Sequence, residues 1–288
     1  MHVRSLPLWY RLLRGVWHGP AGQAVQRRTR IKRLANTLKR SSVVREQLRF
    51  VVRDLAGSPH IARYTLAGNG RPLCLRHGKG DIATFDELMV QGEYEVPPEV
   101  EPVLTSIGRP LRVLDLGGHI GLFGAWAAAH WDVASIVSYE PDPNSAAVLW
   151  AQSRAQGGIT WEVVPAAAWN ANGRLPFVVS SSWIGHVDPE GMEEPETSVA
   201  ARDVLPHLME ADVVKIDIEG AEWTLLEDPR FARTGARVIV LEAHARFCPD
   251  PASPARLAQR TLERAGLRVA HVRPKPYGRV ALLWAIRP

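Results

Sequence analysis

Residues 112–126 read RVLDLGGHIGLFGAW, and this stretch decides the fold. An apolar run over 112–116 leads directly into a turn with three glycines, and a small-residue helix is expected over 120–130. Glycines let a ligand approach the backbone closely, and a helix that begins at such a turn directs its N-terminus at the ligand. The stretch therefore predicts the first strand-turn-helix unit of an α/β domain that binds a ligand at the turn.

The same alternation continues towards the C-terminus. Further strands are expected over 135–140, 160–165, 211–217 and 237–242, and helices over 144–155, around Glu222 and over 255–265, with a closing hairpin of 267–273 and 280–286. Strands joined by helical crossovers imply a mostly parallel sheet covered by helices on both faces. Ligands of such sheets bind at the carboxyl ends of the strands, near the reversal of strand order.

Three regions are expected along the chain. Residues 1–56 form a basic helical arm, because Val44, Leu48, Val51 and Leu55 repeat at helical spacing within 41–56. Residues 57–110 form a lead-in or cap region with short β-like stretches near 64–66 and 72–76 and a helix over 83–91. Residues 111–288 form the ligand-binding domain, in which the polar segment 180–197 is expected to be a loop over one end of the sheet.

The charge is unevenly distributed. Residues 1–53 contain 13 Lys/Arg and one acid, Glu46, which gives +12, whereas the remaining 22 Lys/Arg and 29 Asp/Glu give −7. The arm lacks the pattern of a secretory signal, and no apolar run approaches the roughly 18 residues of a membrane-spanning helix. There are two cysteines and no Cys-x-x-Cys pair. A thiolate zinc site is therefore not expected. A reducing cytoplasmic location is expected.

Two acids sharpen the interpretation of the glycine turn. Asp115 precedes the glycines, where a carboxylate suits a cationic group rather than a pyrophosphate. Glu140 ends the second strand, where a carboxylate accepts hydrogen bonds from ribose hydroxyls. The alanines at 166–168 either leave room for a flat base or simply pack closely. A ligand with a ribose and a positive group is expected, and S-adenosylmethionine meets both demands.

From about residue 76 to 283 the chain resembles the FkbM family of S-adenosylmethionine-dependent methyltransferases. The stretches VLDLGGHIG, SYEPDP, VVKIDIEGAEWTLL and VIVLEAHA carry the resemblance, although Gly118-His119 stands where the family commonly has Ala-Asn. It implies a Rossmann-like class I methyltransferase fold with a seven-stranded sheet, and methyl transfer to a hydroxyl of a sugar, polyketide, glycolipid or other specialised metabolite. The residues expected to bind the cofactor are Asp115, Gly117, Gly118, His119, Gly121, Glu140, Asp142 and Ala167.

Charged residues at two further strand ends are the catalytic candidates. Lys215 and Asp217 share one face of the fourth strand, Glu219 follows at the turn, and the fifth strand ends with Glu242 and His244. Asp217 and His244 are the candidate bases or positioning groups for the acceptor hydroxyl, and a little-perturbed His244 would titrate near neutrality. The alternative is a structural ion-pair network of Lys215, Asp217 and Glu242. Mg²⁺ also suits such oxygen ligands, but no ligand spacing demands it, so no metal site is predicted.

Two other functions stay open. An oxidoreductase using NAD, or an enzyme acting on a nucleotide sugar, would be expected to carry Gly-x-Gly-x-x-Gly, whereas the nearest frame here begins with His119. The basic arm, which contains Trp9, Tyr10 and Trp17, suits an anionic membrane surface or nucleic acid, or is a solvated helix packed on the domain. The absence of an Asn/Asp-Pro-Pro-Tyr/Phe tetrapeptide argues against nucleic-acid bases as acceptors. Residues 1–40 are expected to be dispensable for cofactor binding.

Overall fold

A seven-stranded sheet forms the centre of the molecule. The computed structural model describes residues 20–287 except 79, 180–184, 189–196 and 276–278. Side chains are described from residue 30 onward. The sheet consists of β3 (Leu111–Leu116), β4 (Val133–Tyr139), β5 (Thr160–Val164), β10 (Val213–Ile216), β11 (Val238–His244), β12 (Arg268–Pro274) and β13 (Val280–Ile286). Their order is β12-β13-β11-β10-β3-β4-β5, and only β13 runs antiparallel to its neighbours.

This strand order is that of the class I methyltransferase fold, as predicted. The chain moves outward from β3 through β4 to β5, then returns to the other side of β3 with β10 and β11. The reversal of strand order therefore lies between β3 and β10, and ligands of open α/β sheets bind at the carboxyl ends of strands beside such a reversal.

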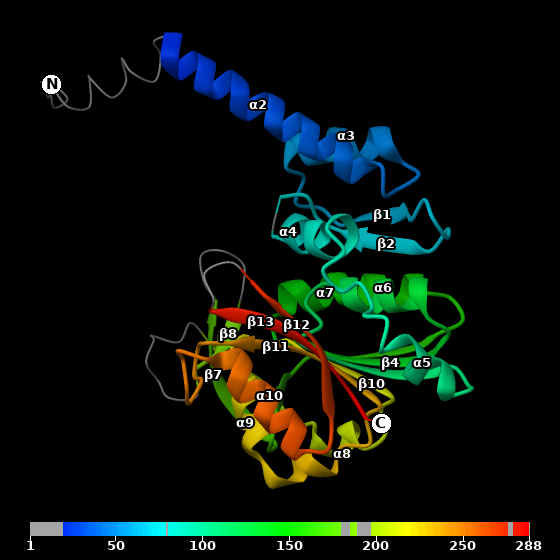
Figure 1. The fold of residues 1–288 in the computed structure, drawn as a ribbon. Coiled ribbons are helices and arrows are strands. Elements are labelled where there is room, and N and C mark those ends of the chain that lie inside the picture. The colour runs from blue at the N-terminus through cyan, green and yellow to red at the C-terminus, as the bar shows by residue number, and fades with distance from the viewer. Residues whose placement is uncertain (1–19, 79, 180–184, 189–196, 276–278, 288) are drawn as a thin grey trace, which may run out of the picture.

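The central strands are apolar because both faces of the sheet are covered. Every residue of β10 and β11 is buried. Figure 1 shows α6 (Leu122–His130) and α7 (Pro143–Ala155) on one face and α8 (Leu205–Leu208), α9 (Glu222–Glu227) and α10 (Pro254–Arg264) on the other. Two apolar cores result, one on each side of the sheet. Charged residues on these strands are therefore confined to the strand ends, where a cavity opens.

The lead-in region packs over α6 and α7. A two-stranded ribbon of β1 (Ala62–Thr65) and β2 (Pro72–Leu75) precedes α4 (Asp81–Phe85), the π-helix η1 (Asp86–Val90) and α5 (Glu101–Ser106). The single helix expected over 83–91 is thus an α-helical turn that widens into a π-helix. Such widening is rare and often occurs at functional sites. Here it carries Glu87 and Leu88 to the wall of the cavity described below.

Two helices form the N-terminal end of the described chain (Figure 1). They are α2 (Pro20–Ser41) and α3 (Gln47–Ala56). The helix expected over 41–56 begins only at residue 47, because Val44 instead forms a β-bridge with Leu66. The aromatic residues of the arm, Trp9, Tyr10 and Trp17, lie outside the described residues.

A second sheet of four strands was not predicted. It contains β6 (Ala167–Trp169), β7 (Gly173–Val179), β8 (Gly185–Val187) and β9 (Thr197–Asp203), in the order β6-β9-β7-β8. The expectation of a loop over 180–197 was therefore wrong for β8 and for the first residue of β9, while 180–184 and 189–196 lie outside the described residues. The alanines at 167 and 168 belong to this sheet rather than to the end of the third strand.

Candidate functional site

A cavity of about 310 Å³ opens at the carboxyl ends of β3, β4 and β10, beside the reversal of strand order. Its wall contains nine of the twelve predicted site residues: Gly117, Gly118, His119, Glu140, Asp142, Ala167, Lys215, Asp217 and Glu219. Glu242 also lines it. Glu242 was weighed in the sequence as part of an ion-pair network. The exceptions are Asp115, Gly121 and His244. Segments far apart in the sequence therefore converge on one cavity, at the edge where the sheet was expected to bind its ligand.

The glycines of the β3–α6 turn serve two different contacts. Gly117 has φ +80°, and a Cβ added there would lie 1.8 Å from the carbonyl oxygen of Asp217. The turn can therefore approach the end of β10 only with glycine at this position. Gly121 has φ +81° and lies against Leu149 of α7, where a Cβ would be 2.7 Å from Cδ1. Gly121 was expected to bind the cofactor, but the structure assigns it to helix packing because it does not line the cavity.

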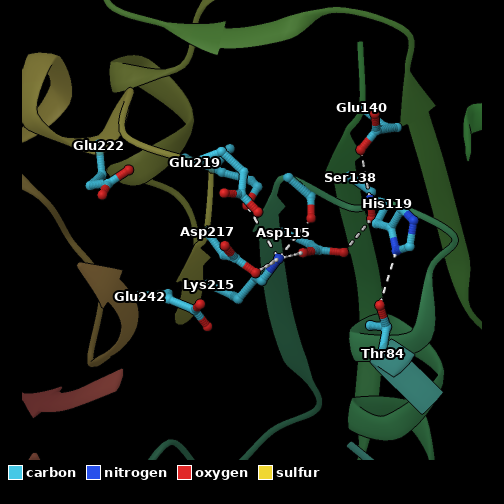
Figure 2. Close-up of polar contacts among 12 residues, drawn as sticks. Thr84, Asp115, His119, Ser138, Glu140, Lys215, Asp217, Glu219, Glu222 and Glu242 are labelled. Carbon is cyan, nitrogen blue, oxygen red and sulfur yellow. Dashed lines mark hydrogen bonds and ion pairs between the residues drawn. The ribbon is translucent and has the colours of Figure 1, made fainter. Parts of the chain in front are cut away.

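Backbone N–H groups hold the carboxylate of Glu140 at the end of β4. His119 donates to Oε2 at 2.7 Å and Asp142 donates to Oε1 at 2.8 Å (Figure 2). Asp142 in turn accepts from the N–H groups of Asn144 and Ser145 and so caps α7. Burial raises the pKa of Glu140 to about 7, although the two backbone N–H groups oppose the rise. Hydroxyl donors from a ligand would favour the ionised form further.

Lys215 joins the ends of β3 and β10. Its Nζ lies 3.5 Å from Oδ1 of Asp115 and 3.4 Å from Oδ2 of Asp217, and it donates to the carbonyl oxygen of Gly117 at 2.7 Å (Figure 2). Burial opposes the charge of this ammonium, but Asp217 and Asp115 outweigh it and raise the pKa of Lys215. The ion-pair network considered from the sequence is therefore present for Lys215 and Asp217.

Asp115 does not face the cavity directly, contrary to expectation. Its side chain is fully buried beneath the glycine turn, where it pairs with Lys215 and accepts from Ser138 Oγ at 3.1 Å. Burial raises the pKa of this carboxyl, opposed by the nearby ammonium of Lys215. Asp115 therefore pairs with Lys215, which itself lines the cavity.

His244 lies behind the cavity wall among carboxylates. Its Nδ1 is 3.1 Å from Glu222 Oε1, and its Nε2 is 3.5 Å from Glu242 Oε1 and 3.6 Å from Glu219 Oε2. Burial opposes protonation, but the carboxylate of Glu222 outweighs it and the pKa of His244 rises well above its ordinary value. The condition for titration near neutrality, a little-perturbed ring, is therefore not met, because carboxylates at both ring nitrogens favour the imidazolium form.

Glu222, at the start of α9, is fully buried. Its carboxylate accepts from the backbone N–H groups of His244 at 2.7 Å and Gly220 at 2.8 Å. It therefore links the start of α9 to the end of β11. Asp217, Glu242 and His244 offer ligand atoms that lie within 4.8 Å of one another, a spacing that would also suit a metal ion. In the structure, Lys215, Lys275 and the imidazolium neutralise these carboxylates.

Sequence reasoning missed several residues of the cavity wall. Glu87 and Tyr94 come from the lead-in region, and Lys275 follows β12. Lys275 Nζ lies 2.8 Å from both Glu93 Oε1 and Glu242 Oε1. Glu87 has no side-chain hydrogen bond or ion pair with the described residues, and burial raises its pKa to about 7. Glu87 lies in the helix expected over 83–91 and Lys275 lies between the strands of the expected hairpin, but neither element was expected at the site.

Carboxylates dominate the charge of the cavity wall. Six carboxyl groups line it (Glu87, Glu140, Asp142, Asp217, Glu219 and Glu242), against the two ammonium groups of Lys215 and Lys275. Burial raises the pKa of Glu87, Glu140 and Glu219 to about 7, so these three carry a partial negative charge at neutral pH. Opposite charge attracts and like charge repels most strongly where water is partly excluded. The cavity therefore favours a ligand with a cationic portion and disfavours a pyrophosphate.

No protein-family model and no curated protein matches the sequence. Many solved structures resemble the fold, and the following three are examples. FkbM methyltransferase from Methylobacillus flagellatus is 15% identical with a TM-score of 0.44, and the match covers 62% of this chain but 43% of that protein. Fibrillarin from Aeropyrum pernix, with bound S-adenosyl-L-methionine, is 16% identical with a TM-score of 0.37, covering 62% and 67%. Magnesium protoporphyrin IX methyltransferase from Synechocystis PCC 6803, also with bound S-adenosyl-L-methionine, is 13% identical with a TM-score of 0.41, covering 71% and 83%. The fold assignment rests on the strand order, and the chemistry must be argued from the site.

Proposed function

We propose that this protein is an S-adenosylmethionine-dependent methyltransferase that methylates a hydroxyl group of a sugar, polyketide, glycolipid or other specialised metabolite. The observation that carries the proposal is the anionic cavity at the strand-order reversal, with the Glu140 carboxylate held at its edge by two backbone N–H groups. The glycine turn, Glu140, Asp142 and Ala167 are the proposed cofactor contacts. A dinucleotide fits less well, because the acidic groups of the wall outnumber its two ammonium groups and would repel phosphates.

The cofactor supplies an electrophilic methyl group when bound, and the residues of the chain do the remaining work. Alignment of the acceptor oxygen with this group contributes several kcal/mol. Asp217, at 26% side-chain exposure, is placed to orient the acceptor. Burial tends to raise its pKa, but Lys215 lowers it below the ordinary value, so Asp217 is a weak base.

Glu87 suits proton acceptance better. Its carboxyl lines the cavity without a partner among the described residues, and burial raises its pKa to about 7. A base of that pKa is half ionised near neutral pH and accepts a proton more readily than an ordinary carboxylate. We therefore propose that Glu87 accepts the proton of the acceptor hydroxyl and that Asp217 positions the acceptor. His244 lies behind them as a buried cation.

Calorimetry on the purified protein tests the cofactor assignment. S-Adenosylmethionine or S-adenosylhomocysteine should bind saturably, and Glu140→Ala should weaken binding at least about tenfold, because a charged acceptor of hydrogen bonds is lost. Glu210→Ala is the matched control, since Glu210 is an exposed acid outside the cavity. Tighter binding of NAD than of either compound would reject the proposal. Methyl-labelled cofactor incubated with a metabolite extract would then identify the acceptor by mass spectrometry.

A further inference from the structure

The helices α2 and α3 expose most of the large apolar side chains found on the described surface. Of nine such residues, seven lie between positions 31 and 61: Ile31, Leu34, Leu38, Leu48, Val52, Leu55 and Ile61. Trp150 and Met209 are the other two. Isolated exposed apolar residues are ordinary on a protein surface, but a concentration on two adjacent helices marks an interaction surface.

The apolar residues of α3 form a regular stripe. Leu48, Val52 and Leu55 are 78%, 59% and 41% exposed and follow the i, i+4, i+7 spacing of one helix face. The opposite face carries Phe50 and Asp54, which are buried against α2 and the lead-in region. The helix therefore has two distinct apolar sides, and only one of them is covered by the described chain.

The helix α2 repeats this pattern and adds charge. Ile31, Leu34 and Leu38 are 59%, 43% and 53% exposed and share one face by their i, i+3, i+7 spacing. At 100° per residue, Arg30 lies on one side of this stripe, and Lys32 and Lys39 lie on the other. None of these three cations has an ion-pair or hydrogen-bond partner for its side chain among the described residues, and all three are exposed.

The paired cations of α2 attach the helix to the rest of the protein. Arg33 donates to the carbonyl oxygens of Asp54 and Leu55, and Arg40 pairs with Asp54 and with Asp86 of η1. Thr37 Oγ1 donates to Asp54 Oδ2 at 2.5 Å. The helix is therefore fixed by its polar face, and the apolar stripe and the three unpaired cations remain exposed.

We propose that the exposed apolar faces of α2 and α3, flanked by Arg30, Lys32 and Lys39, dock on an anionic lipid membrane surface. Aliphatic side chains beside unpaired cations match the two layers of such a surface, acyl chains below and phosphates above. Nucleic acid would engage the cations but leave the leucines in water. A second copy of the chain would bring the same cations face to face. No helix in the described part of the chain is long and apolar enough to span a bilayer.

Co-sedimentation of the full chain with vesicles tests the proposal. Vesicles of phosphatidylcholine with phosphatidylserine should bind the protein, and vesicles of phosphatidylcholine alone should bind it at least about tenfold less strongly. The double variant Leu48→Gln/Val52→Gln should lower the partition coefficient at least about tenfold, because two exposed aliphatic contacts are lost. Both positions are exposed, so folding should be preserved, and the melting curve verifies this.

Two further variants make the test specific. Lys32→Gln/Lys39→Gln should weaken binding to the phosphatidylserine vesicles about tenfold and leave the weak binding to phosphatidylcholine unchanged. Met209→Gln, a matched change of an apolar residue with 59% exposure elsewhere, should bind like the parent. Absence of vesicle binding, or equal binding by all variants, would overturn the proposal. So would a concentration-dependent dimer in sedimentation velocity that Leu48→Gln/Val52→Gln dissolves, or RNA binding that exceeds vesicle binding.

Discussion

Glu87 illustrates how a single side chain can be costly for stability and useful for chemistry. Burial raises its pKa from the ordinary 4.5 to about 7. The unfolded chain ionises this group from about pH 4.5, whereas the folded protein does not until about pH 7. Glu87 therefore subtracts stability progressively between these values, and the full cost is present above pH 7. A group kept at such a cost fits a catalytic role.

Glu87→Gln should raise stability and lower activity. The free energy of unfolding should increase by roughly 2 kcal/mol at pH 8, which is the ~3 kcal/mol of the pKa difference reduced because water screens the exposed part of the side chain. It should be nearly unchanged at pH 4, where the wild-type group is mostly protonated in both states. The single-turnover rate of methyl transfer should fall about 10²–10⁴-fold, and its rise with pH through about 7 should disappear. Denaturant melts at both pH values and rapid-quench kinetics measure these effects. A variant that retains the parental rate would remove Glu87 from the chemistry.

The site residues that follow apolar strands directly were predictable, and those from the cap were not. Glu140 and Asp217 each come immediately after a strand of the sheet, so the binding of ligands at the carboxyl ends of parallel strands predicts their place from the sequence alone. Glu87 sits in DELMV, which has the pattern of an ordinary surface helix. Its place depends on a π-helix and on packing of the cap over α6, neither of which has a local sequence signal. His244 was located correctly at its strand end, but its charge depends on the buried Glu222.

At the scale of elements, the β3–α6 turn shows how closely two strand ends approach. The carbonyl oxygen of Asp217 occupies the space where a Cβ of residue 117 would lie, and Gly117 also adopts φ +80°. Gly108, with φ +66° and no atom within 4 Å of an added Cβ, has the same backbone demand without the contact. The two positions therefore separate backbone strain from steric clash.

Gly117→Ala should destabilise the protein far more than Gly108→Ala. Gly108→Ala should lose only the free energy of the left-handed conformation, about 1 kcal/mol. In Gly117→Ala the methyl group also displaces the end of β10, and we expect a total loss of stability of about 4 kcal/mol. Cofactor affinity should fall at 117 and stay unchanged at 108. Thermal melts and calorimetry on both variants provide the comparison. Similar losses at both positions would mean that the turn relaxes away from Asp217.

Elements differed in how clearly the sequence indicated them. The strands of the main sheet are apolar runs separated by helices. A sheet covered on both faces could therefore be predicted from the sequence. The second sheet was not predicted, because its strands lack a clear pattern. β7 contains Arg174 and Pro176, β8 is three residues long, and β9 includes Ser198 and Arg202. Such strands have little apolar alternation, and they form because Phe177 and Val199 pack into a small core of their own.

At the scale of the whole molecule, the basic arm and the acidic body meet through specific pairs. Residues 1–40 are expected to be dispensable for cofactor binding, but they are not free of the body: Thr37 is fully buried, and Arg40 bridges Asp54 to Asp86 of the cap. Phe50 of α3 also packs against Tyr64 and Phe85 in one core. Removal of residues 1–40 would therefore disturb the cap that carries Glu87, without touching any cofactor contact proposed above.

The matched pair Arg40→Gln and Lys39→Gln tests this coupling. Arg40 is 17% exposed and paired with two carboxylates, whereas Lys39 is exposed and has no side-chain partner among the described residues. Arg40→Gln leaves Asp86 and Asp54 without their guanidinium and should lower the free energy of unfolding by about 1–3 kcal/mol. Lys39→Gln should change it by less than about 0.5 kcal/mol. Affinity for S-adenosylmethionine should be unchanged in both, since neither residue lines the cavity. Equal melting temperatures for the two variants would show that Arg40 does not couple α2 to the cap.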